Sequence, residues 1–237
     1  MQLSERMKDY ENVSRRSLLK GVPVIIRIDG KAFHTFTKNF DKPFDGGLVY
    51  AMAYTTKCVM EKIQGCKMAY TQSDEASFLL TDYDSVETQG WFGYTQSKIE
   101  SVAASMFTAF FNNEMQYLDK PLAFFDARAF NVPKEDVVNY FLWRANDWHR
   151  NSLSMLARAH FSAKELHGKD MFNMHEMLYK EKGINWETHL TPQEKNGTFM
   201  KYRIYGDHKR IEPSYDIENG YGSIHDYMRD FVNERSN

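Results

Sequence analysis

The chain has few cysteines, no excess of charge of either sign and no long apolar run. Only two of its 237 residues are cysteines, Cys58 and Cys66, which excludes a disulfide framework and supplies too few ligands for a zinc site. Both lie in apolar surroundings, so we expect buried free thiols, as in a reducing cytoplasm. Lys and Arg total 30 against 32 Asp and Glu, a balance that argues against coating nucleic acid by charge alone.

Targeting and membrane-spanning signals are also missing. The N-terminal segment MQLSERMKDYENVSRR is charged and lacks the apolar stretch of a signal peptide. No apolar run approaches the roughly 18 residues that a membrane helix needs. We therefore expect a cytoplasmic protein without a membrane partner.

Apolar residues nevertheless make up 42% of the chain, which is enough for a substantial core. After a predicted helix within 1–20, periodicity predicts strand, helix, strand, strand, helix and strand over 22–28, 47–64, 66–71, 76–81, 95–112 and 122–132. This order is typical of the split βαβ, or ferredoxin-like, arrangement. The expected fold class is thus α+β, with an antiparallel sheet that carries helices on one face.

The predicted core with its N-terminal helix occupies residues 1–133. Residues 134–237 form a helical extension with a late strand and loop, packed on the core as one compact unit. Within the extension the pattern predicts helices over 134–166 and 170–182, a strand over 197–206 and a loop over 207–224.

Two acidic turns are the strongest candidates for a functional site. Asp29 ends the first predicted strand, whereas Asp74 and Glu75 begin the third. In a ferredoxin-like sheet these strands are central antiparallel neighbours, so the two turns should share one rim. Crowded carboxylates repel one another, and Mg²⁺ relieves that repulsion while it also binds substrate phosphates. Gly30 would let the backbone approach a triphosphate closely. Asp-Gly and Ser-Asp are also ordinary turn sequences, so their convergence on one rim carries the prediction.

Basic and polar residues elsewhere have two interpretations each. Lys98, near the start of a predicted helix, is either a point charge for a triphosphate or an ordinary helix residue. Arg144, Asp147 and Asn151 share one face of the long helix, where Arg144 and Asp147 could simply form a solvated pair. Arg27 is expected to point to an open sheet face, where it could pair with a carboxylate or stack on a base.

Four blocks, RIDGKAFH (27–34), AYTQSDEASFLL (69–80), FDARAFNVP (125–133) and YFLWRANDWHRNSL (140–153), occur in this order. In these blocks the sequence resembles the tRNA-His guanylyltransferase family, especially its shorter tRNA-repairing members from bacteria, archaea and phages. The resemblance implies a palm-like catalytic core that adds nucleotides to a tRNA 5′ end in the 3′–5′ direction. ATP or GTP would activate the 5′-monophosphate, the 3′-hydroxyl of an incoming nucleoside triphosphate, usually GTP, would attack it, and pyrophosphate would finally be removed.

The resemblance also implies roles for individual residues and an assembly. Asp29, the Gly30 carbonyl and Asp74 would bind two Mg²⁺ ions. The catalytic residues would be Asp29, Asp74 and Glu75, of which Glu75 would support metal or phosphate binding. The expected nucleotide contacts are Asp29, Gly30, Lys31, Ala32, Phe33, His34, Ser73, Asp74 and Lys98. Arg144, His149 and Asn151 are candidates for the tRNA and its 5′ end, although a histidine on such a helix can equally be a packed residue. Family members assemble as homotetramers.

One departure concerns the helix block, in which Ser152 replaces the last residue of the eukaryotic His-Ile-Asn-Asn motif. This difference favours a template-directed repair enzyme with a looser choice of tRNA. Two other classes of protein remain open. An RNA-binding module on the same scaffold would need aromatic platforms on the central strands, where only Phe78 is available. A nucleotide cyclase shares the palm-like core but has no need of the WRANDWHRNS block.

Overall fold

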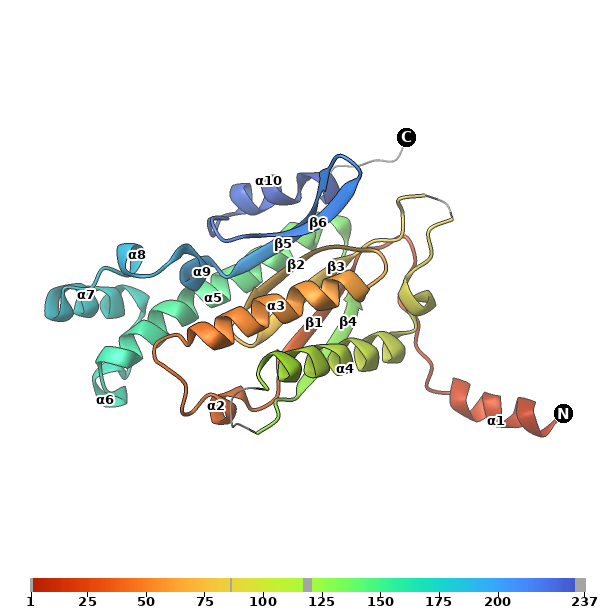
Figure 1. The fold of residues 1–237 in the computed structure, drawn as a ribbon, viewed down its shortest axis with the longest axis horizontal. Coiled ribbons are helices and arrows are strands. Elements are labelled where there is room, and N and C mark those ends of the chain that lie inside the picture. Colours follow the sequence, from red (N-terminus) through yellow and green to blue (C-terminus); the bar gives the residue numbers. More distant parts are fainter. Residues whose placement is uncertain (1, 86, 117–120, 233–237) are drawn as a thin grey trace.

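The computed structural model describes residues 2–85, 87–116 and 121–232, and it contains a six-stranded antiparallel sheet between layers of helices (Figure 1). The strands are β1 Val24–Gly30, β2 Cys66–Gln72, β3 Glu75–Leu80, β4 Phe125–Asn131, β5 Thr198–Tyr205 and β6 His208–Ser214. The main helices are α1 Leu3–Asn12, α3 Gly46–Lys62, α4 Gln96–Glu114, α5 Val137–His160, α7 Met171–Lys182 and α10 Tyr221–Val232. The short helices are α2 Phe33–Phe36, α6 Ala163–Leu166, α8 Trp186–His189 and α9 Pro192–Asn196.

The first four strands have the predicted ferredoxin-like order. The sheet runs β4-β1-β3-β2-β5-β6, so β1 and β3 are antiparallel neighbours at its centre. Helices α3 and α4 cover one face, where Ile26, Ile28 and Phe78 from the strands pack with Met52 and Phe107 from the helices. The predicted α+β class, with the core helices on one face, is confirmed.

The helical extension covers the opposite face. Ile25 of β1 and Leu79 of β3 pack there against Phe141 of α5 and Met228 of α10. Alternate residues of β1 therefore enter two different cores, which explains why this strand is apolar without interruption up to Arg27. The sheet face that was expected to be open beside Arg27 is occupied, because the Arg27 guanidinium lies 5.9 Å from the ring of Trp143 on α5.

Several predicted boundaries were wrong. The N-terminal helix ends at Asn12 instead of residue 20, and β4 begins at Phe125 instead of residue 122. The long helix ends at His160, because Phe161 is extended and Ser162 caps the separate helix α6 with a capping box. Of the two free cysteines, Cys66 is buried as expected, whereas Cys58 is only partly buried.

The predicted loop over 207–224 was also wrong, because it contains β6 and the start of α10. The sequence of β6, HKRIEPS, is mostly charged and includes Pro213, features that suit an edge strand and obscure the alternation of a half-buried one. The predicted extension runs to residue 237, and residues 233–237 lie outside the described part of the chain.

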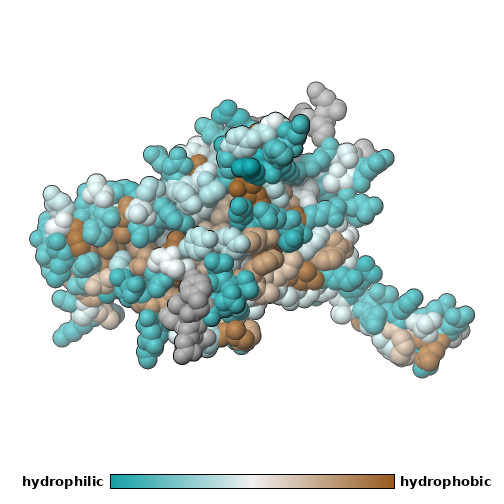
Figure 2. Space-filling model, in the orientation of Figure 1, coloured by the Kyte–Doolittle hydropathy of each residue, from teal (hydrophilic) through white to brown (hydrophobic). Residues whose placement is uncertain are grey.

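Helix α1 projects from the body of the molecule as an arm, and Figure 2 shows apolar side chains on its surface. None of its residues, all of which the structure describes, is buried. Within the described ranges, no helix combines the length and the apolar character needed to cross a membrane.

Candidate active site

The two acidic turns meet at one rim of the sheet, as predicted. Asp29 lies directly opposite Glu75 in the antiparallel register of β1 and β3. The backbone N–H of Gly30 donates a hydrogen bond to the carbonyl of Asp74 over 3.1 Å, which joins the end of β1 to the β2–β3 turn. Residues 45 positions apart in the sequence are thereby held on adjacent backbone segments.

Strained backbone surrounds this rim on both sides. Ser73 in the β2–β3 turn has a φ of 49°, and Ala32 after β1 has a φ of 53°. A left-handed conformation costs a residue with a side chain about 1–2 kcal/mol. Such strain clusters at functional sites, where the surrounding fold enforces it. Here it allows a two-residue turn to carry Asp74 and a sharp bend to follow Asp29.

Burial, together with a smaller repulsion from Asp29, makes the carboxylate of Asp74 a position that favours a cation. Burial raises the pKa of Asp74, and the negative charge of Asp29 raises it further. The hydroxyl of Ser73 opposes this effect by donating a hydrogen bond to Asp74 Oδ1 over 2.9 Å. The bare carboxylate is therefore less favourable at this position than in water, and a bound cation would relieve the penalty.

The donor atoms of the rim fit a magnesium ion. Asp29 and Asp74 supply carboxylate oxygens, and Gly30, the residue after Asp29, supplies a backbone carbonyl oxygen. Mg²⁺ in proteins typically takes one or two carboxylates and completes its octahedron with water and substrate phosphates. Within the part of the chain that the structure describes, no group of three or more His, Cys, Asp or Glu side chains is placed to hold a metal. The rim thus offers a site that needs substrate oxygens for completion.

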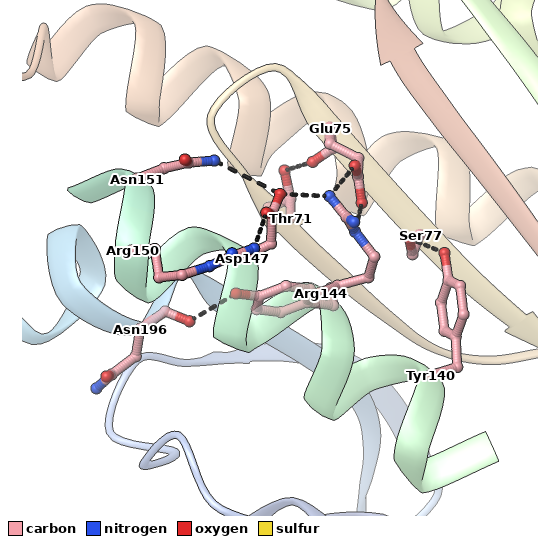
Figure 3. A network of polar contacts seen from close by, with 10 residues as sticks. Thr71, Glu75, Ser77, Tyr140, Arg144, Asp147, Arg150, Asn151 and Asn196 are labelled. Carbon is pink, nitrogen blue, oxygen red and sulfur yellow. Dashed lines mark hydrogen bonds and ion pairs between the residues drawn. The ribbon is translucent and has the colours of Figure 1, made fainter. Parts of the chain in front are cut away.

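The carboxylate of Glu75, the residue after Asp74, is bound by Arg144 of α5 (Figure 3). The guanidinium of Arg144 donates from Nε to Glu75 Oε1 and from Nη2 to Glu75 Oε2, both over 2.7 Å. Burial raises the pKa of Glu75, and the charge of Arg144 opposes this shift. Because Glu75 and Arg144 are each only 7% exposed, the two charges require each other.

The network continues along α5 toward solvent. Arg144 Nη2 also donates to Asp147 Oδ2 over 3.0 Å, and Arg150 Nη2 donates to Asp147 Oδ1 over 2.7 Å. The side-chain amide of Asn151 lies 3.5 Å from Asp147 Oδ2. The contact of Arg144 with tRNA stays a prediction, and in this structure its side chain is buried and bonded to two carboxylates. Asn151 remains exposed near the site.

A pocket with an empty volume of about 770 Å³ adjoins the rim. Its wall includes Ser73 and Asp74 and continues into α3, α5 and the start of β5. Its apolar lining includes Phe33, Phe40, Phe44, Met52 and Trp148. Phe33, an expected nucleotide contact, is 5% exposed and also packs against Phe125, with ring centroids 5.0 Å apart. The expected contacts Lys31, Ala32 and His34 are exposed on the segment that follows β1.

Two arginines lie beside Asp29 on the α5 face, and sequence reasoning missed Arg128 altogether. Arg27 and Arg128 are direct cross-strand partners on β1 and β4. Like charges in this position repel, so an anion is favoured next to them. Arg27 Nε is buried and has no hydrogen-bond partner among the described residues. The alternation Asp126-Ala127-Arg128 on a predicted strand indicates that Asp126 and Arg128 share one face of the sheet, and this pattern could have identified Arg128.

Lys98 and His149 are not brought to the rim. Lys98 lies in the first turn of α4, beside Gln96, whose side chain donates to the carbonyl of Ala129. The end of α4 that lies near the rim is the opposite one, where Thr108 accepts from the N–H of Phe125. The His149 ring packs against the tilted ring of Trp186 with centroids 4.5 Å apart, and burial lowers the pKa of His149. His149 is thus a packed residue in this chain, the second of its two interpretations.

The ferredoxin-like sheet and its carboxylate rim define the class of the protein, a nucleotidyltransferase with a palm-like catalytic core. The model of the family described as tRNAHis guanylyltransferase matches residues 4–133. The tRNA(His) guanylyltransferase of Schizosaccharomyces pombe is 34% identical over 231 residues, covering 90% of this chain and 86% of the relative. The chain belongs to the tRNAHis guanylyltransferase family, a family of transferases, and the resemblance seen in the four blocks is confirmed.

Solved structures agree with this assignment. A bacterial tRNA(His) guanylyltransferase-like protein in complex with ATP has a TM-score of 0.88 and 42% identity, covering 98% of this chain and 97% of its own. A bacterial protein of the same description in complex with GTP has a TM-score of 0.83 and 39% identity, covering 98% and 99%. The guanylyltransferase of Saccharomyces cerevisiae has a TM-score of 0.70 and 25% identity, covering 81% and 91%.

Proposed function

We propose that this chain adds nucleotides, typically GMP from GTP, to the 5′ end of tRNA in the 3′–5′ direction. It would act as a tRNA-His guanylyltransferase or in template-directed repair of tRNA 5′ ends. The observation that carries the proposal is the rim on which Asp29 and Asp74 meet, within a chain related to guanylyltransferases over most of its length. Relatives with bound ATP and GTP support both triphosphates as substrates.

Asp29, the carbonyl of Gly30 and Asp74 would hold two Mg²⁺ ions. Bound there, magnesium supplies charge stabilisation for the attacking and leaving oxygens of a phosphoryl displacement. The raised pKa of Asp74 means that the metal-free rim holds its negative charge at a cost, which a divalent cation removes. The substrate oxygens that complete the coordination explain why two carboxylates are sufficient.

The chain's own residues would position the nucleotide. The aromatic pocket beside Ser73 and Asp74 has an apolar lining suited to the flat face of a nucleobase. The segment from Lys31 to His34 borders the rim, and the first N–H groups of α2 have no partner inside that helix. These groups, together with the ammonium of Lys31, are suited to hold a triphosphate while its base lies in the pocket.

Arg27 and Arg128 would receive a second set of phosphates. Their cross-strand position, two residues before Asp29 along β1, places two guanidinium groups next to the site. Arginine matches phosphate oxygens with paired donors. We assign to them either the 5′ end of the tRNA or the phosphates of the incoming nucleotide. By family resemblance the protein would work as a cytoplasmic homotetramer.

The two competing classes are less consistent with the structure. An RNA-binding module would stack bases on exposed aromatic residues of the central strands. Phe78, the one candidate, is fully buried beneath α3 and α4, and α5 covers the other face. A nucleotide cyclase would use the same rim and is separated from a tRNA enzyme by its product.

The test is incorporation of labelled GTP into tRNA in the presence of Mg²⁺, with intact tRNA-His compared with several 5′-shortened tRNAs. Asp29→Ala and Asp74→Ala should abolish incorporation while circular dichroism stays unchanged. Glu61→Ala, which removes an exposed carboxylate from the far end of α3, is the matched control and should keep full incorporation. Cyclic nucleotide formation, or RNA binding without turnover, would contradict the proposal, as would normal turnover in either aspartate variant.

A further inference from the structure

Glu75 stands beside the proposed metal ligands without joining them. Its Cα is the direct register partner of Asp29, and it follows Asp74 in the chain. Its two oxygens nevertheless accept from Arg144 over 2.7 Å each. Both oxygens of Glu75 are thus held in an ion pair whose partners lie 69 residues apart, and among the described residues no three carboxylates are placed to share a metal ion.

Without Arg144, a third carboxylate would be available at the rim. Affinity for a divalent cation rises with the number of charged ligands, and Mg²⁺ sites that act on phosphates keep positions open for the substrate. A three-carboxylate rim would bind a cation more tightly before the nucleotide arrives and would leave it fewer open positions. The reacting phosphates would then have to displace a protein ligand.

We propose that Arg144 is a positioning residue that keeps Glu75 away from the metal ions, so that the rim stays a two-carboxylate site completed by substrate. The inference deepens the proposed function and rests on it. A guanidinium is suited to this task because its planar fork engages both carboxylate oxygens at once. Lysine, with a single point charge, would leave one oxygen of Glu75 free to turn toward Asp29.

The surroundings of Arg144 hold its side chain in place. Asp147 accepts from Nη2, the nitrogen that also donates to Glu75 Oε2, and is itself bound by Arg150. The ring of Trp143 lies 4.5 Å from the guanidinium carbon and covers it. Three neighbours on α5 therefore fix one arginine, and the helix carries this arrangement to the rim as a rigid unit.

The experiment measures binding of Mn²⁺, a paramagnetic substitute for Mg²⁺, to the full chain without nucleotide. Arg144→Lys is the main variant, and Arg144→Met is a more severe one. Both should bind Mn²⁺ about tenfold more tightly than the wild type, the size typical of changes around metal ligands. The value of kcat for nucleotide addition should fall with little change in the KM for GTP. The double variant Glu75→Gln with Arg144→Lys should return Mn²⁺ affinity to the wild-type value.

Lys201→Met is the matched control, because it also removes a buried cation, one whose ammonium donates to the carbonyl of Tyr227 over 2.8 Å. It should leave Mn²⁺ affinity unchanged. Unchanged or weaker Mn²⁺ binding in Arg144→Lys would overturn the positioning role and leave the proposed function standing. A wild-type protein that binds no Mn²⁺ would instead refute the metal site itself. If Arg144→Met does not fold, the lysine variant alone decides the question.

Discussion

At the scale of single residues, the glycine after Asp29 is required by a side chain and not by a turn. A Cβ atom built on Gly30 would lie 2.2 Å from the ring of Phe33, and its backbone does not adopt the left-handed conformation that favours glycine. The aromatic ring packs directly over the chain where β1 ends. The same ring lines the pocket beside Asp74, so one contact links the backbone of the rim to the shape of the pocket.

Gly30→Ala should therefore destabilise the protein and distort the pocket. The inserted methyl group must displace a buried ring, and overpacking of this kind typically costs about 1–3 kcal/mol. Urea unfolding measures the loss, and the KM for GTP reports the pocket. Gly46→Ala is the control, because among the described residues nothing lies within 4 Å of a Cβ at that position. Equal stability of the two variants would show that the Phe33 ring can move aside without a measurable loss of stability.

Asp74 illustrates a functional residue that the fold holds at a cost. Its carboxylate is partly buried beside Asp29, and its folded-state pKa is raised, mainly by burial. A raised pKa means that the folded state disfavours the charged form relative to the unfolded chain. The penalty is present above the folded-state pKa and disappears as the pH falls below the unfolded value near 4.

Asp74→Asn should consequently stabilise the metal-free protein at pH 7, by about 1 kcal/mol, while it removes activity. The gain should shrink as the pH is lowered toward 4, because the wild-type carboxyl then becomes neutral as well. Thermal unfolding in the presence of a chelator, at a series of pH values, measures both effects. Addition of Mg²⁺ should stabilise the wild type and not the variant. A variant that is less stable than the wild type at pH 7 would contradict the assigned electrostatics.

At the scale of elements, local patterns predicted the core more successfully than the extension. Hydrophobic periodicity and the Asp-Gly and Ser-Asp turns were sufficient to place β1, β2, β3 and their shared rim, since the ferredoxin-like topology fixes which strand ends meet. The pairing of Arg144 with Glu75 could not be found in this way, because Glu75 is distant in sequence and the helix offers only Asp147, one turn away. Packing of α5 against the sheet adds Glu75 as a second partner, and Arg144 bonds both.

The C-terminal elements escaped detection for a related reason. Helix α10 is short and begins directly after the Gly- and Asp-rich segment that resembles a loop, although its apolar face, with Ile224, Tyr227 and Met228, is buried against α5 and the sheet. His149 faces Trp186 because α8 folds back over α5, a tertiary contact that helical periodicity cannot reveal.

Lys201 fastens α10 to the sheet, and its removal should loosen this helix. The ammonium is 6% exposed and bonds the carbonyl of Tyr227, with Asp230 Oδ2 at 3.4 Å. Lys201→Met would leave that carbonyl without its donor, at a cost of about 1–3 kcal/mol. Relative to the wild type, hydrogen exchange in the variant should increase more in α10 than in β1 and β3. Exchange that rises equally in all three elements would indicate global destabilisation instead of a local clamp.

At the scale of the whole molecule, one sheet organises two of the three cores. The third core lies beyond the sheet, where the second half of α5 meets α6, α7 and α8 through Leu156, Leu178 and Trp186. Because α5 belongs to both the sheet face and this outer core, we propose that residues 1–133 and 134–237 fold as one unit. The helix that positions Arg144 is thereby supported on two sides.

Among the main helices of the described chain, α1 alone contributes no buried residue to these cores. Leu3, Met7 and Tyr10 are exposed at helical spacing, and an isolated helix of 10 residues is only marginally stable in water. The chain joins the body just after it, where Arg16 accepts from the N–H of Gln96 and the N–H of Leu18 donates to the carbonyl of Tyr94.

Deletion of residues 2–13 should change the free energy of unfolding of the monomer by less than about 0.5 kcal/mol, because it removes no buried side chain. Deletion of residues 2–19 should cost clearly more, since it also removes the hydrogen bonds of Arg16 and Leu18 and the bridge between Ser17 and Thr95. Urea unfolding at low protein concentration separates the two deletions, and sedimentation at high concentration shows whether the apolar face of α1 serves the proposed homotetramer. Equal losses in the two deletions would mean that the arm stabilises the body through contacts other than these anchors, and the described boundary between arm and body would then be misplaced.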